Sequence, residues 1–282
     1  MKKFRLFALI LALPFLTCCR GHITMGLYPN ADKYLVGNQV YEGTVSKIDV
    51  DWISGQVTLN PSYEVNGVEI AEENNLDEKS KVHSYFVDGV IYLKFMASGH
   101  RAVIDEKDKH VLLTYNPSAI EDIKLHLTSG KLVGTTIAAI NDIDIGLTSG
   151  RVEIDSLNAK KVKIDVTSGY TLVNEIKSEE LTATMTSGTI ITKNVDTKTY
   201  SGHSTSGTLE TSFTNLETGD IHFTSGTLKL TMPQSGGKVI VDKTSGSVTT
   251  NRECTIEGST YKFGDGTAVI NVGMTSGRIV ID

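Results

Sequence analysis

Two histidines and an aspartate are the residues of this chain whose types and spacing could hold a metal ion. His203, His222 and Asp242 each lie two residues before the Thr of a repeated Thr-Ser-Gly triplet. If the repeats stack in sequence order, the three side chains are consecutive neighbours on one outward face. Two imidazoles and a carboxylate form a ligand set that zinc accepts. The alternative is a solvated polar row, which the sequence favours, so we expect no metal and no cofactor.

A cysteine near the N-terminus is a second candidate, for covalent lipid attachment. The chain opens with the basic Met1-Lys2-Lys3-Phe4-Arg5, continues through an apolar run and reaches Leu16-Thr17-Cys18-Cys19. This order resembles a bacterial lipobox and predicts residues 1–18 as a lipoprotein signal peptide, with Cys19 lipidated. The alternative is an ordinary cleaved signal peptide. Lipidation would place the protein in the bacterial cell envelope, extracytoplasmic and anchored to a membrane, which is then one of its partners.

Charge and cysteine content exclude one class of partner and one kind of covalent bond. The formal net charge is −6, and cleavage before Cys19 would remove Lys2, Lys3 and Arg5 and leave −9. An acidic protein has no electrostatic attraction to a phosphate backbone, so we expect no nucleic-acid partner. Beyond Cys19 the mature chain would hold only Cys254, which excludes an internal disulfide. We expect Cys254 to be a small buried residue and not a nucleophile.

The sequence carries none of the common catalytic motifs. No Gly-x-Ser-x-Gly, His-Glu-x-x-His, P-loop or calcium-binding Gly-Gly-x-Gly-x-Asp pattern occurs. The enzymatic alternative is a polysaccharide-acting β-helix enzyme, which would need long loops to build a cleft. Between Thr128 and Gly246 every repeat is within one residue of the same length, which leaves no room for such loops. The acidic segment 69–81 is the remaining candidate for the wall of a catalytic cleft. We expect it to be a solvated loop instead. We therefore expect a non-catalytic protein.

A repeated triplet defines the elements that must position these residues. Thr-Ser-Gly occurs eight times, at steps of 20, 19, 19, 19, 19, 20 and then 31 residues. A period this regular predicts stacked structural repeats. The glycines of the triplets are Gly130, Gly150, Gly169, Gly188, Gly207, Gly226, Gly246 and Gly277.

Apolar and polar residues alternate on both sides of each triplet. Ile143, Ile145 and Leu147 precede Thr148, and Val152 and Ile154 follow it. Such alternation is typical of half-buried β-strands, so each repeat reads as strand, triplet, strand and short link. We predict an all-β fold, a β-solenoid of about 19–20-residue two-strand coils with two facing sheets. An up-and-down sandwich of hairpins is the competing fold.

The triplet itself has a structural and a functional interpretation. Gly supplies a close backbone approach, and Ser and Thr hydrogen-bond the bend and stack into ladders. Alternatively, the threonines form a binding face for ice or carbohydrate. The structural role is favoured, because each coil offers only one regular Thr beside a glycine.

The chain divides into four parts. After the signal peptide, residues 19–40 are predicted to be a tether. Residues 41–116 are predicted to be an irregular β region that caps the stack. Residues 117–282 form the regular solenoid, with an insertion at 253–266 as the C-terminal cap. In the coil of Thr205, the inward places hold Tyr200, Gly202 and Ser204, which predicts a weak spot in the core.

Three stretches carry a family resemblance. They are the segment 48–57, the repeated Thr-Ser-Gly, and the ending from Phe263-Gly264-Asp265-Gly266 through 275–281. Over about residues 41–282 the chain resembles the bacterial putative-adhesin domain of unknown function, akin to auto-transporter adhesin head-like β-solenoids. The resemblance implies an all-β solenoid associated with the envelope. It implies no established activity and no catalytic residues.

The sequence therefore favours a lipid-anchored envelope solenoid that acts as a non-catalytic binding or scaffold surface, such as an adhesin. Its partner would be an extracellular or envelope protein or a glycan. An envelope-stress or signalling accessory lipoprotein is the first alternative, and the polysaccharide-acting enzyme is the second.

Overall fold

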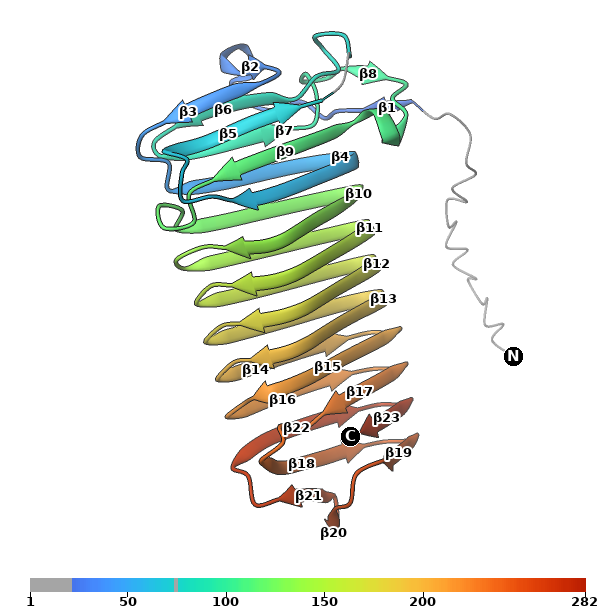
Figure 1. The fold of residues 1–282 in the computed structure, drawn as a ribbon. Helices are drawn as coiled ribbons and strands as arrows, with labels where there is room; N and C mark the ends of the chain where they lie inside the picture. Colours follow the sequence, from blue (N-terminus) through green and yellow to red (C-terminus); the bar gives the residue numbers. More distant parts are fainter. Residues whose placement is uncertain (1–21, 74–75) are drawn as a thin grey trace, which may run out of the picture.

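β-Strands stacked along one axis make up most of the protein (Figure 1). This computed structural model describes residues 22–73 and 76–282. They form strands β1 to β23 and two short 3-10 turns, η1 (Ala31–Lys33) and η2 (Glu106–Asp108). Among these residues the structure contains no helix that could span a membrane. Each turn of the coil contributes one layer of the stack, which we call a rung.

Four long strands form the middle of the stack: β10 (Asp122–Ala138), β11 (Asp142–Asn158), β12 (Lys161–Lys177) and β13 (Glu180–Asp196). Each strand bends at its triplet, so that its two arms face one another (Figure 1). Neighbouring strands pair in parallel with triplet beside triplet, as Ser149 with Ser168 and Ser168 with Ser187. This pairing confirms the predicted solenoid, because an up-and-down sandwich would pair consecutive strands antiparallel.

Four further rungs lie toward the C-terminal end, each divided into two strands at the triplet. Their strands are β14 (Thr199–Ser204) and β15 (Thr208–Asn215), β16 (Thr218–Phe223) and β17 (Thr227–Thr231), β18 (Gly236–Lys243) and β19 (Ser247–Thr250), and β22 (Ala268–Met274) and β23 (Arg278–Ile281).

The last two of these rungs exchange their order in space. β22 and β23 pair with β16 and β17 on one side and with β18 and β19 on the other. The final rung in sequence is therefore the second-last rung of the stack. Within the insertion at 253–266, β20 (Thr255–Glu257) pairs with β21 (Thr260–Gly264), which runs antiparallel along the outer edge of β18. The inserted residues thus cover part of the end of the stack while the chain returns inward.

The opposite end begins with β4 (Lys47–Pro61), which lies parallel to β10 with Ile53-Ser54-Gly55 at the level of the triplets. β7 (Val90–Lys94) and β9 (His110–Tyr115) lie parallel to β4 on its other side. Antiparallel strands then follow outward: β6 (His83–Val87) on β7, β5 (Gly67–Glu72) on β9, β2 (Leu35–Val36) on β6 and β3 (Gln39–Glu42) on β5. β1 (Ile23–Thr24) pairs with β8 (Arg101–Ala102). Strands β1–β3 and β5–β9 with their connections are the N-terminal cap.

Two segments of the cap differ from the sequence-based expectation. Residues 22–40, expected to belong to a tether, form β1, η1, β2 and the start of β3. The acidic segment 69–81, expected to be a solvated loop, contributes to β5 and buries Glu72 and Ser80. Alternation cannot identify strands of two residues, and a buried carboxylate has no local sequence pattern.

The hydrophobic core lies between the two arms of each rung. Ile143, Ile145 and Leu147 on the first arm of β11 are at most 2% exposed, as are Val152 and Ile154 on the second arm. The alternation predicted these inward positions correctly. Each such side chain contributes about 1.5–3 kcal/mol by leaving water, so stacking several rungs supplies the stability that one repeat lacks.

The expected weak spot in the rung of Thr205 is filled by an aromatic ring. Tyr200 is 2% exposed, and its Cε1 atom lies 3.1 Å from where a Cβ on Gly202 would be. The ring meets Phe213 edge-on, with 5.1 Å between centroids, and the hydroxyl is 3.1 Å from Oγ1 of Thr211. The expectation of a poorly packed rung was wrong, because the missing side chain of Gly202 provides room for Tyr200.

The triplet glycines bring the corners of neighbouring rungs into close contact. Gly188 has a φ of +115°, and a Cβ added there would lie 2.4 Å from the carbonyl oxygen of Gly169. A left-handed backbone this close to the next chain is accessible to glycine and strained for other residues. The corner geometry therefore accounts for one glycine in each repeat.

Candidate functional site

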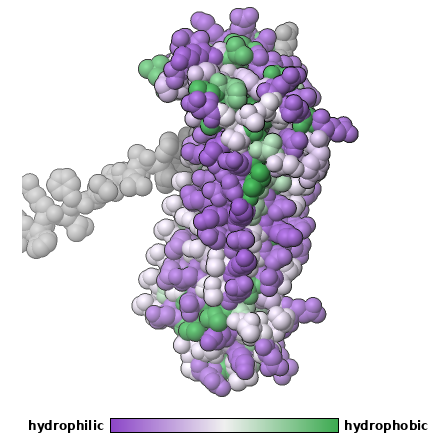
Figure 2. Space-filling model, turned by 90° about the vertical axis from the view of Figure 1, so that its left-hand side faces the viewer, coloured by the Kyte–Doolittle hydropathy of each residue, from purple (hydrophilic) through white to green (hydrophobic). Residues whose placement is uncertain are grey.

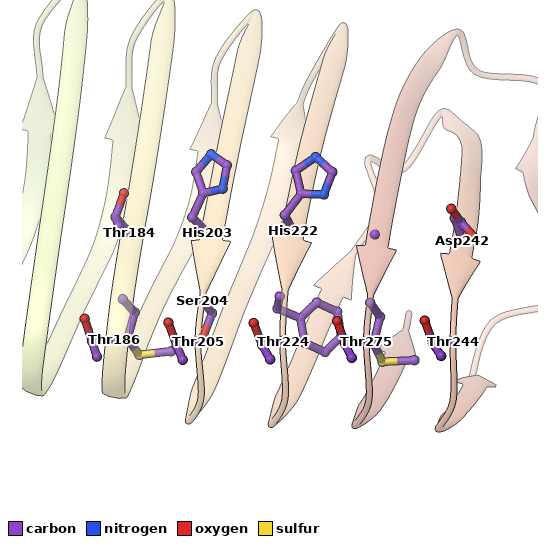
Figure 3. A pocket seen from close by; sticks show the side chains of 14 residues that line it. Thr184, Thr186, His203, Ser204, Thr205, His222, Thr224, Asp242, Thr244 and Thr275 are labelled. Atoms are coloured by element: carbon purple, nitrogen blue, oxygen red, sulfur yellow. The ribbon is translucent and has the colours of Figure 1, made fainter. Parts of the chain in front are cut away.

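A shallow depression of about 540 Å³ lies on the outward face of the C-terminal rungs (Figure 3). Two parallel columns border it, the triplet threonines and the residues two positions before them. The floor between the columns is formed by Met185, Ser204, Phe223 and Met274, the outermost residues of the core on these rungs. The lining residues labelled in Figure 3 are Thr184, Thr186, His203, Ser204, Thr205, His222, Thr224, Asp242, Thr244 and Thr275.

The threonine column is uninterrupted from the rung of β10 to the last C-terminal rung. The rung of Thr275 lies between those of Thr224 and Thr244, so the step of 31 residues in the sequence leaves no gap in space. All eight triplet threonines are exposed. The neighbouring serines hold the corner, since Ser206 Oγ donates to the carbonyl of Thr186 at 3.3 Å and Ser225 Oγ to that of Thr205 at 3.2 Å. Ser is therefore a corner residue, whereas the Thr hydroxyls face solvent.

Two imidazoles stack on adjacent rungs beside this column. His203 and His222 pair across β14 and β16, with 5.8 Å between ring centroids and 17° between ring planes. His222 Nε2 lies 3.2 Å from Oδ1 of Asp220, and His203 Nε2 lies 3.2 Å from Oγ of Ser201. Asp220 and Ser201 each lie two residues before their histidine and on the same face, so they orient the rings. The structure therefore places the two predicted histidines together.

Asp242 does not join them, which corrects the expected adjacency. The neighbour of His222 in the next rung is Gly273, and Asp242 pairs with the other side of Gly273. Two rung spacings of about 4.8 Å therefore separate the backbones of His222 and Asp242. Within residues 22–73 and 76–282, no group of three or more His, Cys, Asp or Glu side chains is arranged to hold a metal ion. The candidate ligand set of His203, His222 and Asp242 is therefore not assembled, because the last rung is inserted between His222 and Asp242.

Gly273 shapes the middle of the depression. A Cβ at this position would lie 2.6 Å from Nδ1 of His222, so the imidazole occupies space that a side chain would need. On the far side of Gly273, Asp242 and Thr244 complete the wall. The site thus offers an imidazole face, a carboxylate and a row of hydroxyls around a surface hollow. Such groups bind polar ligands by stacking and hydrogen bonding, and sequence order alone gave no indication of Gly273.

A second cluster, buried in the N-terminal cap, was not predicted from the sequence. Lys109 Nζ donates to Oε1 of Glu72, and it also donates to the carbonyl of Ser80 at 2.7 Å. Its ammonium lies 4.9 Å from the centroid of Phe95 and 5.3 Å from that of Trp52.

Both members of this pair are shielded from solvent, with exposed side-chain fractions of 0% for Lys109 and 1% for Glu72. Burial lowers the pKa of Lys109 from its ordinary value, because desolvation penalises the ammonium, while Glu72 opposes that effect. The second carboxylate oxygen of Glu72 accepts a hydrogen bond from the backbone N–H of Val82 at 2.8 Å. The buried pair therefore links three segments of the cap, those of Glu72, of Ser80 to Val82 and of Lys109.

The two cysteines singled out in the sequence have different outcomes. Cys19 lies outside the described residues. Cys254 is partly buried and packs against the core, and it is a free thiol.

Comparison with known proteins identifies the architecture. The family model described as Toastrack DUF4097 matches residues 39–215 and 140–263. No curated protein matches the sequence.

Solved structures share the fold at low sequence identity. A protein titled putative adhesin from Bacteroides fragilis is 14% identical with a TM-score of 0.53, covering 89% of this chain and 97% of its own. A putative adhesin from Parabacteroides distasonis is 13% identical with a TM-score of 0.54 and the same coverages. A protein titled putative lipid binding protein from the same organism is 11% identical with a TM-score of 0.50, again covering 89% and 97%. At these identities the likeness concerns the fold.

Proposed function

This chain belongs to the Toastrack DUF4097 family, and we propose that it is a lipid-anchored protein of the bacterial envelope whose solenoid is a non-catalytic, adhesin-like binding surface. Three observations support the proposal: the lipobox-like N-terminus, the uniform rungs, and the depression beside His203 and His222. We assign the binding role to the depression, because it combines stacking and hydrogen-bonding groups on a rigid scaffold.

Attachment of lipid at Cys19 is supported by the basic start, the apolar run and the Leu16-Thr17-Cys18-Cys19 sequence. Replacing the thiol removes the attachment point. We expect Cys19→Ala to release the protein from membranes, and continued retention of this variant in the membrane fraction would contradict the anchor.

A glycan is the ligand class that the depression fits best. The ring face of His222 can stack on the apolar face of a sugar, and the hydroxyls of Thr224 and Thr275 can pair with sugar hydroxyls. Asp242 adds an acceptor on the far side of Gly273. Because the side chains along the column differ from rung to rung, specificity would lie in His203, His222 and Asp242 and not in the shared threonines.

A glycan array with matched variants tests the proposal. The test protein is His203→Ala combined with His222→Ala, and the control is His126→Ala, since His126 occupies the same column at the level of β10. We expect the wild type and the control to bind a common set of glycans and the double variant to lose at least tenfold in affinity. Equal binding by the double variant would contradict the assigned site. An empty array together with capture of an envelope protein would favour an accessory role instead.

A further inference from the structure

We propose that the outermost strands of the N-terminal cap, β2 and β3, contact the surface of a zwitterionic lipid bilayer through Leu35, Val36 and Val40. The inference rests on the proposed lipid anchor. It adds to that anchor an orientation of the whole stack and a second, non-covalent membrane contact.

Exposed apolar side chains are concentrated in the cap. Among the described residues, nine large hydrophobic side chains are exposed, and seven of them lie between residues 27 and 103. Val40 is 62% exposed and Leu35 is 50% exposed. Figure 2 shows apolar patches among the hydrophilic atoms of this end. Single exposed apolar residues are ordinary, but their concentration at one end of an elongated molecule points to a contact surface.

Leu35, Val36 and Val40 lie on the strands farthest from the solenoid at this end. The described pairing of β2 is to β6 alone, and that of β3 is to β5 alone. Both therefore form the outer limit of the cap (Figure 1). A planar membrane that contacts the stack at its N-terminal end therefore meets β2 and β3 first.

Chain length places the anchor near the same end. His22, the first described residue, is three residues after Cys19, a separation of at most about 11 Å in a fully extended chain. The residues that follow are fixed to the cap, since Met25 N–H donates to the carbonyl of His100 at 2.9 Å and Tyr28 N–H to Oγ of Ser98 at 3.1 Å. A lipid on Cys19 would thus hold the cap, and not the C-terminal rungs, against the bilayer.

The charges beside the apolar residues indicate the kind of lipid. Asp32 and Lys33 on η1 are both exposed and offset one another in charge, whereas Glu42 on β3 and Glu69, opposite Val40 on β5, are exposed carboxylates and leave an acidic excess. Carboxylates at this place are repelled by an anionic membrane face. The contact therefore depends on apolar burial in a zwitterionic surface. In this orientation the depression near His222 lies at the end of the molecule that points away from the membrane.

Spin labels on the lipidated protein in vesicles of phosphatidylcholine and phosphatidylethanolamine test the orientation. In a Cys254→Ser background, Leu35→Cys and Val40→Cys report on the cap, and Ile256→Cys is the control, because Ile256 is 57% exposed and lies in the C-terminal insertion. We expect the two cap labels to become at least threefold more accessible to oxygen than to a water-soluble nickel complex on vesicle binding, while the control label does not change.

Two negative results have different meanings. If intact mass shows lipid on Cys19 and the protein is bound to vesicles, but the cap labels behave like the label at 256, the membrane contact is overturned and the anchor stands. If Cys19 carries no lipid and the protein remains in solution, the proposed anchor fails and the orientation fails with it.

Discussion

His222 lies beside Gly273 and not beside Asp242, although Asp242 belongs to the next repeat in the sequence. The imidazole leans into the space above the glycine, where a Cβ would be only 2.6 Å from Nδ1. This relationship exists because the last rung of the chain is inserted between its two predecessors. As a result, His203 and His222 form a stacked pair, and the carboxylate of Asp242 lies apart from them.

Gly273→Ala tests how far the glycine determines the position of His222. The backbone φ of Gly273 lies outside the left-handed region, so a methyl group displaces the exposed imidazole without backbone strain. We expect the unfolding free energy to change by less than about 1 kcal/mol, while NMR shows the His222 ring moved from the His203 stack. Gly146→Ala is the control. Its added Cβ would lie 3.0 Å from Cδ2 of His126 in the same column, so it crowds His126 and not His222. An unmoved His222 ring would contradict the assigned contact.

Gly188→Val tests the corner geometry. The added Cβ meets the carbonyl oxygen of Gly169 at 2.4 Å, and the residue has a φ of +115°. Both effects strain the backbone, and we expect destabilisation of at least about 2 kcal/mol in denaturant unfolding. Gly26→Ala is the control, because no atom lies within 4 Å of the added Cβ and its backbone is not left-handed. Similar midpoints for both variants would refute the structural role of the triplet glycine.

Lys109→Met tests the buried pair in the cap. It removes the ammonium and leaves Glu72 charged in a site where its side chain is 1% exposed. Breaking a buried ion pair on one side costs about 3–5 kcal/mol. We expect Lys109→Met combined with Glu72→Gln to be more stable than Lys109→Met alone, since the remaining charge is then removed. A double variant whose cost equals the sum of the two single costs would show that the two residues are not coupled.

Alkaline pH should destabilise the fold through buried tyrosines. Burial raises the pKa of Tyr200 from 10.0 to about 12. The unfolded chain therefore loses this proton first, so the stabilisation is present below pH 10.0 and is lost as the pH rises toward 12. For Tyr200 the loss amounts to about 2–3 kcal/mol.

Tyr200→Phe separates this effect from other titrations. The variant should be about 1 kcal/mol less stable near pH 8, because the hydrogen bond to Thr211 is lost. Between pH 8 and pH 11 its unfolding free energy should fall less than that of the wild type. Tyr115 still contributes in both proteins, because burial also raises its pKa to about 12. Parallel pH profiles of the two proteins would contradict the role of Tyr200.

Local sequence patterns predicted the rung but not the order of the rungs. Alternation around Thr148 identified Ile143, Ile145 and Leu147 as core residues, because side-chain direction in a strand depends only on neighbouring positions. Nothing local distinguishes a rung that follows its predecessor from one that enters between two others, and Asp242 was therefore misplaced. The pair of Lys109 and Glu72 was missed for the same reason, since residues 37 positions apart meet only through the folding of the cap.

Both ends of the stack are closed by strands that run out of sequence order, whereas β10 to β13 follow one another and pair in the same register. We therefore expect that duplicating or deleting one whole repeat in this middle section leaves the strand pairing at both ends in place. Each such event would shift the histidine pair along the axis by one increment of about 4.8 Å relative to the cap. The number of middle rungs therefore sets the distance between the cap and the histidine pair.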